Sequence, residues 1–162
     1  MTRLLPFVLS AMLVSGAASA APPAPAAAPK AAAPTGADFL ARNAAEPGVQ
    51  TLPSGLQYKV VAAGPAGGPS PKAGDIIKVH YEGKLVSGEV FDSSFARGKP
   101  VLMPLADLVP AWMEALPRMK VGDEWMLYVP ADLGYGAEGA GPIPPNSVLI
   151  FRIKLLGMLS PD

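Results

Sequence analysis

The segment at residues 79–94, VHYEGKLVSGEVFDSS, holds the residues best suited to chemistry, because Asp92 directly follows Phe91 in an otherwise sheet-like apolar stretch. Burying an unpaired carboxylate is costly, so Asp92 needs a partner or a chemical task. The chain has no cysteine and one histidine, His80, which excludes disulfides, thiol nucleophiles and thiolate metal sites. His80 alternates with Tyr81 and is interpreted as a sheet-surface residue rather than a base.

Alternating apolar and polar residues predict the strands that would position these side chains. In IIKVHYEGKLV, Ile77, Val79 and Tyr81 share one face, and a tight turn at residues 87–88 lets EVFDSS return antiparallel. LQYKVV, EWMLYVP and SVLIFRIKLLGM predict further strands, and LVPAWMEALPRM predicts one short helix that Pro117 should end. The pattern indicates an α+β domain, a twisted antiparallel sheet closing over one helix, at residues 51–160.

The first 50 residues have a different composition. Arg3, an apolar stretch and the small residues up to Ala20 are typical of a signal peptide at residues 1–20. Residues 21–36 are rich in alanine and proline and are interpreted as a disordered spacer. Residues 37–50 are expected to form a short helix and a linker, since Thr35 and Asp38 have capping-box spacing.

The charge of the chain is balanced. Lys and Arg total 13, and Asp and Glu also total 13, so no basic footprint points to a nucleic-acid partner. The apolar stretch near the N-terminus is short for a membrane span, and no stable membrane anchor is expected.

Several motifs together resemble the FKBP-type peptidyl-prolyl cis-trans isomerases. They are GLQYKVV, VHYEGKLVSGEVFDSS, GKPV, LVPAWMEALPRMKVGDEWMLYVP, LGYG and IPPNSVLIFRIKLL, which cover roughly residues 48–158 in the family order. The resemblance implies the family fold, an antiparallel sheet half-wrapped around a short helix. It also implies a proline-binding pocket, isomerase activity toward X–Pro bonds and no cofactor or metal.

The resemblance assigns the pocket residue by residue. Its catalytic positions correspond to Tyr81, Asp92, Tyr135 and Phe151. Its substrate-binding positions correspond to Phe91, Val101, Leu108, Val109, Trp112 and Ile143. Many family members have an aromatic residue where this chain has Val101, which is expected to leave one wall of the pocket lower. Asp92 is expected to accept a hydrogen bond from the Tyr81 hydroxyl.

The reaction itself needs neither a nucleophile nor a metal. Rotation about a peptide bond has a barrier of roughly 18–20 kcal/mol. The planar ground state carries more charge on the carbonyl oxygen than the twisted transition state, so a dry aromatic pocket favours the twisted state.

Two other functions fit the same residues. One is a non-catalytic proline-peptide binding module, and the other is a folding chaperone for envelope proteins. Only one short helix precedes the domain, so the resemblance implies a short form without a helical dimerisation arm, and a monomer. Expected partners are proline-containing unfolded polypeptides, with macrolide inhibitors of the tacrolimus or rapamycin type as ligands of the pocket. The signal peptide predicts a periplasmic location.

Overall fold

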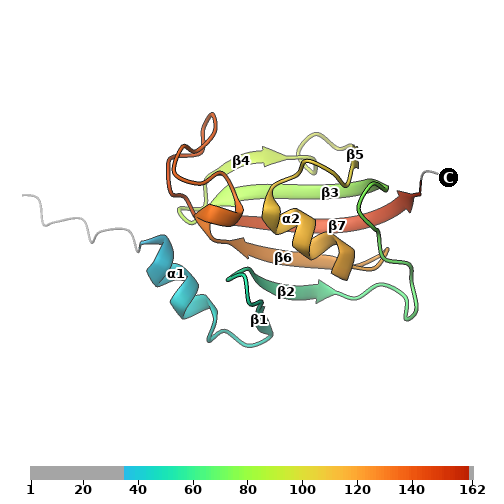
Figure 1. The fold of residues 1–162 in the computed structure, drawn as a ribbon, viewed down its shortest axis with the longest axis horizontal. Coiled ribbons are helices and arrows are strands. Elements are labelled where there is room, and N and C mark those ends of the chain that lie inside the picture. The colour runs from blue at the N-terminus through green and yellow to red at the C-terminus, as the bar shows by residue number, and fades with distance from the viewer. Residues whose placement is uncertain (1–34, 161–162) are drawn as a thin grey trace, which may run out of the picture. The chain divides into compact units, whose positions relative to one another are not determined.

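The computed structural model describes residues 35–160, which form one antiparallel sheet with one helix across its face and a second helix near its end (Figure 1). The sheet has the strand order β1-β2-β6-β7-β3-β4, and β5 also pairs with β3. The strands are β1 Val49–Thr51, β2 Gln57–Ala62, β3 Ile76–Leu85, β4 Val90–Ser93, β5 Val101–Pro104, β6 Glu124–Val129 and β7 Leu149–Leu159. The helices are α1 Gly36–Asn43 and α2 Pro110–Ala115, with 3₁₀ turns η1 Leu116–Arg118 and η2 Ala131–Leu133.

The predicted fold class is confirmed: the sheet curves around α2 and buries one face against it (Figure 1). Trp112 and Leu116 are buried on the helix side. They meet strand residues that alternate toward the same face, such as Val79, Leu127 and Ile153, all 0% exposed. The long central pair β3 and β7 positions this core, because its register runs from Ile76↔Leu159 to Leu85↔Leu149.

Short strands form the edges of the sheet. β1, at one end, has 3 residues. At the other end, β4 and β5, each 4 residues long, pair with different parts of β3. Ser94 lies between those two pairings, where its backbone N–H donates to the Tyr81 carbonyl at 2.8 Å and its hydroxyl accepts from the Tyr81 N–H at 2.8 Å. Both the N–H and the C=O of Tyr81 therefore have a hydrogen-bond partner, although neither β4 nor β5 pairs with this residue.

Helix α1 contacts the face of the sheet that points away from α2: Phe39 lies 6.0 Å, centre to centre, from the ring of Tyr128, whose neighbours Leu127 and Val129 face the core. Thr35 caps it by accepting from the Asp38 N–H, the interaction that the sequence spacing indicates. The buried Asn43 side chain donates to Gln57 Oε1 at 2.8 Å, and Gln57 Nε2 donates to the Leu40 carbonyl at 2.9 Å. This pair of amides ties the end of α1 to β2.

Some elements differ from expectation. Strands β1 and β5 and the turn η2 were not predicted, and β1 crosses the expected domain start at residue 51. Helix α2 ends at Ala115, and Pro117 continues the chain as a 3₁₀ turn. The predicted signal peptide and most of the spacer lie outside the described residues. Within residues 35–160, no helix combines the length and apolar character that a membrane crossing requires.

Candidate active site

A small cavity of about 150 Å³ opens on the α2 side of the sheet. Its lining comes from β3, β4, β5, β7, the start of α2 and the loop after η2. These residues are Tyr81, Phe91, Asp92, Met103, Leu108, Val109, Trp112, Tyr135 and Phe151. The structure thus brings together all the predicted site residues except Val101 and Ile143.

Aromatic rings in edge-to-face contact make the floor and walls of the cavity. The Trp112 ring lies 5.2 Å from the Tyr81 ring at 80° and 5.4 Å from the Phe151 ring at 84°. Phe91 meets Phe151 at 5.7 Å and 86°. These are favourable geometries for the ring quadrupoles. Trp112 is only 4% exposed, and its indole N–H has no hydrogen-bond partner among the described residues.

Gly83 makes this ring arrangement feasible. A Cβ at this position would lie 2.5 Å from Phe91 Cζ and 2.8 Å from Phe151 Cε1. Carbon atoms pack at about 3.5–4.0 Å, so a side chain here would displace both rings. The glycine is needed for space, because its φ is not in the left-handed region.

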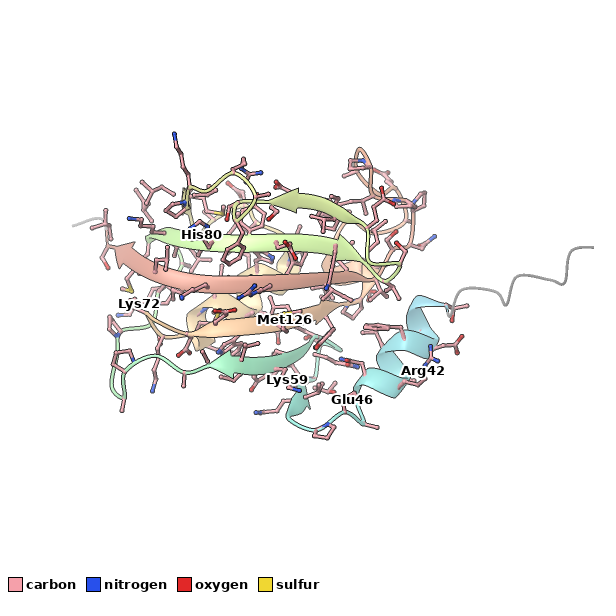
Figure 2. All side chains as sticks on the ribbon, turned by 180° about the vertical axis from the view of Figure 1, so that it is seen from behind. Arg42, Glu46, Lys59, Lys72, His80 and Met126 are labelled. Carbon is pink, nitrogen blue, oxygen red and sulfur yellow. The ribbon has the colours of Figure 1, made fainter. Side chains whose placement is uncertain are left out.

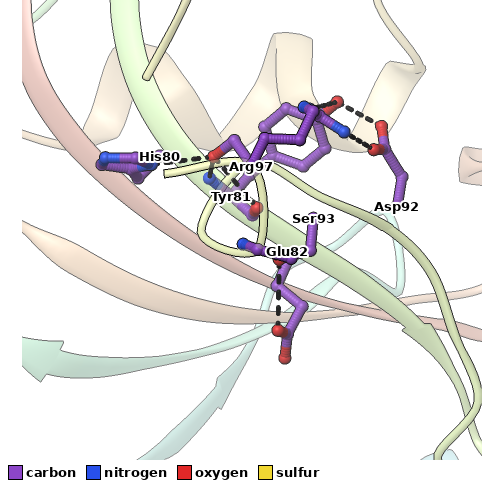
Figure 3. A network of polar contacts seen from close by, with 8 residues as sticks. His80, Tyr81, Glu82, Asp92, Ser93 and Arg97 are labelled. Atoms are coloured by element: carbon purple, nitrogen blue, oxygen red, sulfur yellow. Dashed lines mark hydrogen bonds and ion pairs between the residues drawn. The ribbon is translucent and has the colours of Figure 1, made fainter. Parts of the chain in front are cut away.

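A polar network closes one side of the cavity (Figure 3). The Tyr81 hydroxyl donates to Asp92 Oδ2, as predicted, and Arg97 Nη1 donates to Asp92 Oδ1. The guanidinium carbon of Arg97 also lies 5.8 Å from the centre of the Tyr81 ring, within range of a cation–π interaction. Asp92 therefore has two partners, one for each oxygen.

The network sets the charge of its members. Burial raises the pKa of Asp92, but hydrogen bonds from Tyr81 and Arg97 outweigh it and hold that pKa below its ordinary value. Burial, and then the hydrogen bond to Asp92, raise the pKa of Tyr81. At neutral pH the site therefore presents a charged carboxylate and a neutral phenol.

Arg97 and Met103 belong to the site but were not predicted from the sequence. Arg97 lies in the loop after β4, five residues beyond Asp92. The sequence analysis expected a partner for Asp92 and named the Tyr81 hydroxyl, whereas the second partner, Arg97, is identified only by the fold. Met103 has a longer and more flexible side chain than Val101, and it lies two residues further along β5 on the same side of the sheet.

Two predicted residues do not line the cavity. Val101 on β5 pairs with Val79 on β3 and is not among the residues that line the cavity. Ile143 is 6% exposed and packs in the core, where the bridge between Ala140 and Ile143 holds the loop after η2. Tyr135 from the same loop lines the rim of the cavity and is 39% exposed.

Comparisons with known proteins agree with this geometry. A family model described as FKBP-type peptidyl-prolyl cis-trans isomerase matches residues 67–156. A second model, the domain amino terminal to FKBP-type peptidyl-prolyl isomerase, matches residues 12–60. The second match overlaps the segments interpreted as signal peptide and spacer.

The curated relatives are longer than this chain. The peptidyl-prolyl cis-trans isomerase Mip of Coxiella burnetii is 50% identical over 121 residues, which cover 74% of this chain and 52% of the relative. The FKBP-type 22 kDa peptidyl-prolyl cis-trans isomerase of Escherichia coli is 46% identical over 131 residues, covering 80% and 63%. The chain thus spans about half to two thirds of the length of these relatives.

Solved structures share the fold. The crystal structure of FkpA from Escherichia coli superposes with a TM-score of 0.74 and 40% identity, covering 77% of this chain and 58% of that one. A peptidyl-prolyl cis-trans isomerase from Pseudomonas syringae superposes with a TM-score of 0.71 and 36% identity, covering 77% and 91%. The motifs, the cavity and these matches together establish that the chain belongs to the FKBP-type peptidyl-prolyl cis-trans isomerase family.

Proposed function

We propose that the chain accelerates cis-trans rotation of X–Pro bonds in folding polypeptides. The observation that carries the proposal is the aromatic cavity of about 150 Å³. An apolar cavity of that size is known to hold a six-membered ring, so it has room for the pyrrolidine ring of proline. Family membership supports the same activity.

The walls of the cavity supply the catalytic effect. Trp112 forms the floor under the proline ring, and Phe91 and Phe151 exclude water around the rotating bond. The twisted amide carries less charge separation than the planar one, so the dry site stabilises the transition state more than the ground state. Lowering the barrier by about 4 kcal/mol would increase the rate nearly a thousandfold.

Polar groups at the rim orient the substrate. Tyr135 is partly exposed and is suited to donate a hydrogen bond to a substrate carbonyl. Asp92 fixes the direction of the Tyr81 ring, while the negative charge of Asp92 faces the substrate carbonyl carbon. Burial raises the pKa of Asp92, but hydrogen bonds from Tyr81 and Arg97 lower it further, so Asp92 carries its charge at neutral pH.

The first test is isomerisation of a short chromogenic peptide with leucine before proline. The full chain is compared with Trp112→Ala and Asp92→Asn. The proposal predicts acceleration well above the uncatalysed rate, reduced in both variants. A folded wild-type chain without acceleration would leave only a proline-peptide binding module, and full activity of Asp92→Asn would refute the electrostatic role.

We further propose that the protein acts in the periplasm as a monomer, with a signal peptide at residues 1–20 and an isomerase domain from about residue 51. A relative from Legionella longbeachae is named outer membrane protein MIP, which supports an envelope location. Mass spectrometry of periplasmic extracts should find an N-terminus at Ala21. Size-exclusion chromatography tests the monomer, and tacrolimus titration of the tryptophan fluorescence of the wild-type chain tests macrolide binding.

A further inference from the structure

A second concavity lies on the other face of the sheet, beside α1. It has a volume of about 530 Å³. Helix α1 contributes Phe39 and Arg42 to one wall, the turn after it contributes Glu46, and the outward side chains of the strands form the floor. Figure 2 shows this face, with Arg42 and Glu46 on the helix side and Lys59 and Met126 on the sheet. We call it the α1 groove.

The α1 groove is separate from the active-site cavity. In β7 the neighbouring residues Ile150 and Phe151 point to opposite faces: Ile150 lines the groove, and Phe151 lines the cavity. The wall of the groove is fixed, because the buried hydrogen bond between Asn43 and Gln57 ties α1 to β2. A ligand in the groove therefore leaves the cavity free.

The groove is elongated. Its lining crosses the sheet from Val49 on β1 through Lys59, Tyr128 and Ile150 to Lys84 on β3. Those are four steps between neighbouring strands, or about 19 Å at roughly 4.8 Å per step. This length matches about six residues of extended polypeptide at roughly 3.3 Å per residue, and it exceeds the reach of a compact small molecule.

The charges of the groove are mostly positive. It includes the cations Arg42, Lys59 and Lys84, and one acid, Glu46. Within residues 35–160, none of these cations takes part in an ion pair. The floor between the two lysines is apolar, with Met126 and Ile150. The groove thus offers positive ends and an apolar centre.

We propose that the α1 groove binds an extended acidic segment of a partner polypeptide. Lys59 on β2 and Lys84 on β3 are three strand steps apart across the sheet, about 14 Å, and two residues apart along the strands, about 7 Å. Their Cα atoms are therefore roughly 16 Å apart, a spacing that the flexible lysine side chains can shorten by a few ångströms. Carboxylates at positions i and i+4 of an extended chain are about 13 Å apart, and the residue at i+2 points to the same side. The groove therefore fits acidic-x-apolar-x-acidic, with the apolar side chain over Met126 and Ile150.

The test uses a fluorescein-labelled peptide, Gly-Glu-Ser-Leu-Ser-Glu-Gly, and fluorescence anisotropy at low ionic strength with the full chain. The proposal predicts saturable binding that weakens about tenfold or more in Lys59→Glu/Lys84→Glu, because two attractive pairs become repulsive. The double variant Lys72→Glu/Lys120→Glu carries the same charge change on exposed residues away from the groove and should bind like wild type. A peptide with lysine in place of glutamate should not bind.

The isomerase assay and circular dichroism show whether each variant is folded. The milder Lys59→Gln/Lys84→Gln should weaken binding less than the charge reversal does. Equal binding by the groove and control variants would overturn the proposal. Two other results would also overturn it. One is that the chain binds phosphatidylglycerol vesicles but not the peptide. The other is that the chain binds no peptide but self-associates, and Lys59→Glu/Lys84→Glu abolishes that self-association. The anisotropy experiment measures peptide binding directly. If the chain showed no isomerase activity, the binding result would still decide whether the α1 groove takes an acidic peptide.

Discussion

Replacing Gly83 by alanine tests whether the ring arrangement of the cavity matters for turnover. The added methyl group would lie 2.5 Å from Phe91 Cζ and 2.8 Å from Phe151 Cε1, so each ring must move by about 1 Å to reach normal contact. Phe151 is 3% exposed and already packs on Trp112. The displaced rings would therefore move into the cavity of about 150 Å³ that they line, and would reduce the space for the substrate.

Two opposing energies set the stability of Gly83→Ala. Overpacking a core costs about 1–3 kcal/mol, and the reduced freedom of the unfolded chain offsets about 0.4–1 kcal/mol. We expect a net loss of up to about 2.6 kcal/mol in the free energy of unfolding, from the difference of those ranges. The effect on kcat/KM should be larger, about 10- to 100-fold, since a shift of about 1 Å in a binding wall can misplace the reacting bond.

The assay combines urea unfolding with isomerisation of the chromogenic peptide. Gly157→Ala in β7 is the matched control, because no heavy atom lies within 4 Å of the place its methyl group would take and its φ is not left-handed. It should keep wild-type kcat/KM. A folded Gly83→Ala protein with wild-type kcat/KM would refute the view that proline binds between these rings.

The polar contacts lead to three further predictions. Arg97→Gln should raise the pKa of Asp92 toward its ordinary value and lower kcat/KM only a few-fold, since exposed ion pairs are weak. NMR titration of the carboxyl checks the pKa, and an unchanged value would contradict the assigned pairing. The kcat/KM should be flat between about pH 5 and 9. Because the pKa of Asp92 is lowered in the folded state, this group stabilises the fold at pH values above the ordinary pKa of aspartate. That stabilisation is lost as the pH falls through the folded-state pKa. The raised pKa of Tyr81 makes the fold lose stability as pH rises above about 10. A pH–rate profile with a step near pH 7 would disagree. Asn43→Ala should cost about 1–3 kcal/mol by removing the donor to the Gln57 side-chain oxygen Oε1, and should weaken acidic-peptide binding without changing the isomerase rate. Urea unfolding measures the first effect and anisotropy the second, and equal peptide affinity would argue against a rigid groove wall.

The sequence predicted the elements with a clear period and missed those without one. The alternation in β3 and β7 and the helical spacing around Trp112 are local signals, and the structure confirms them. Strand β5 has only 4 residues and ends at Pro104, so its pairing with β3 depends on the tertiary fold rather than on its own pattern.

The sequence also predicted part of the site. Tyr81, Phe91 and Trp112 were placed by resemblance, and the structure gathers them around one cavity. The contact of Arg97 with Asp92 could not be read from spacing, because it depends on the path of a loop. The α1 groove was also beyond prediction, since it forms only when the amide pair of Asn43 and Gln57 brings α1 onto the sheet.

The short edges of the sheet have a consequence for a protein proposed to work among unfolded chains. A long, flat edge strand offers a row of free backbone groups that can recruit another chain and start aggregation. Here one edge is the 3-residue β1. The other edge is divided between β4 and β5, and between them Ser94 bonds both the N–H and the C=O of Tyr81. The domain can therefore meet aggregation-prone polypeptides while giving them little backbone to pair with.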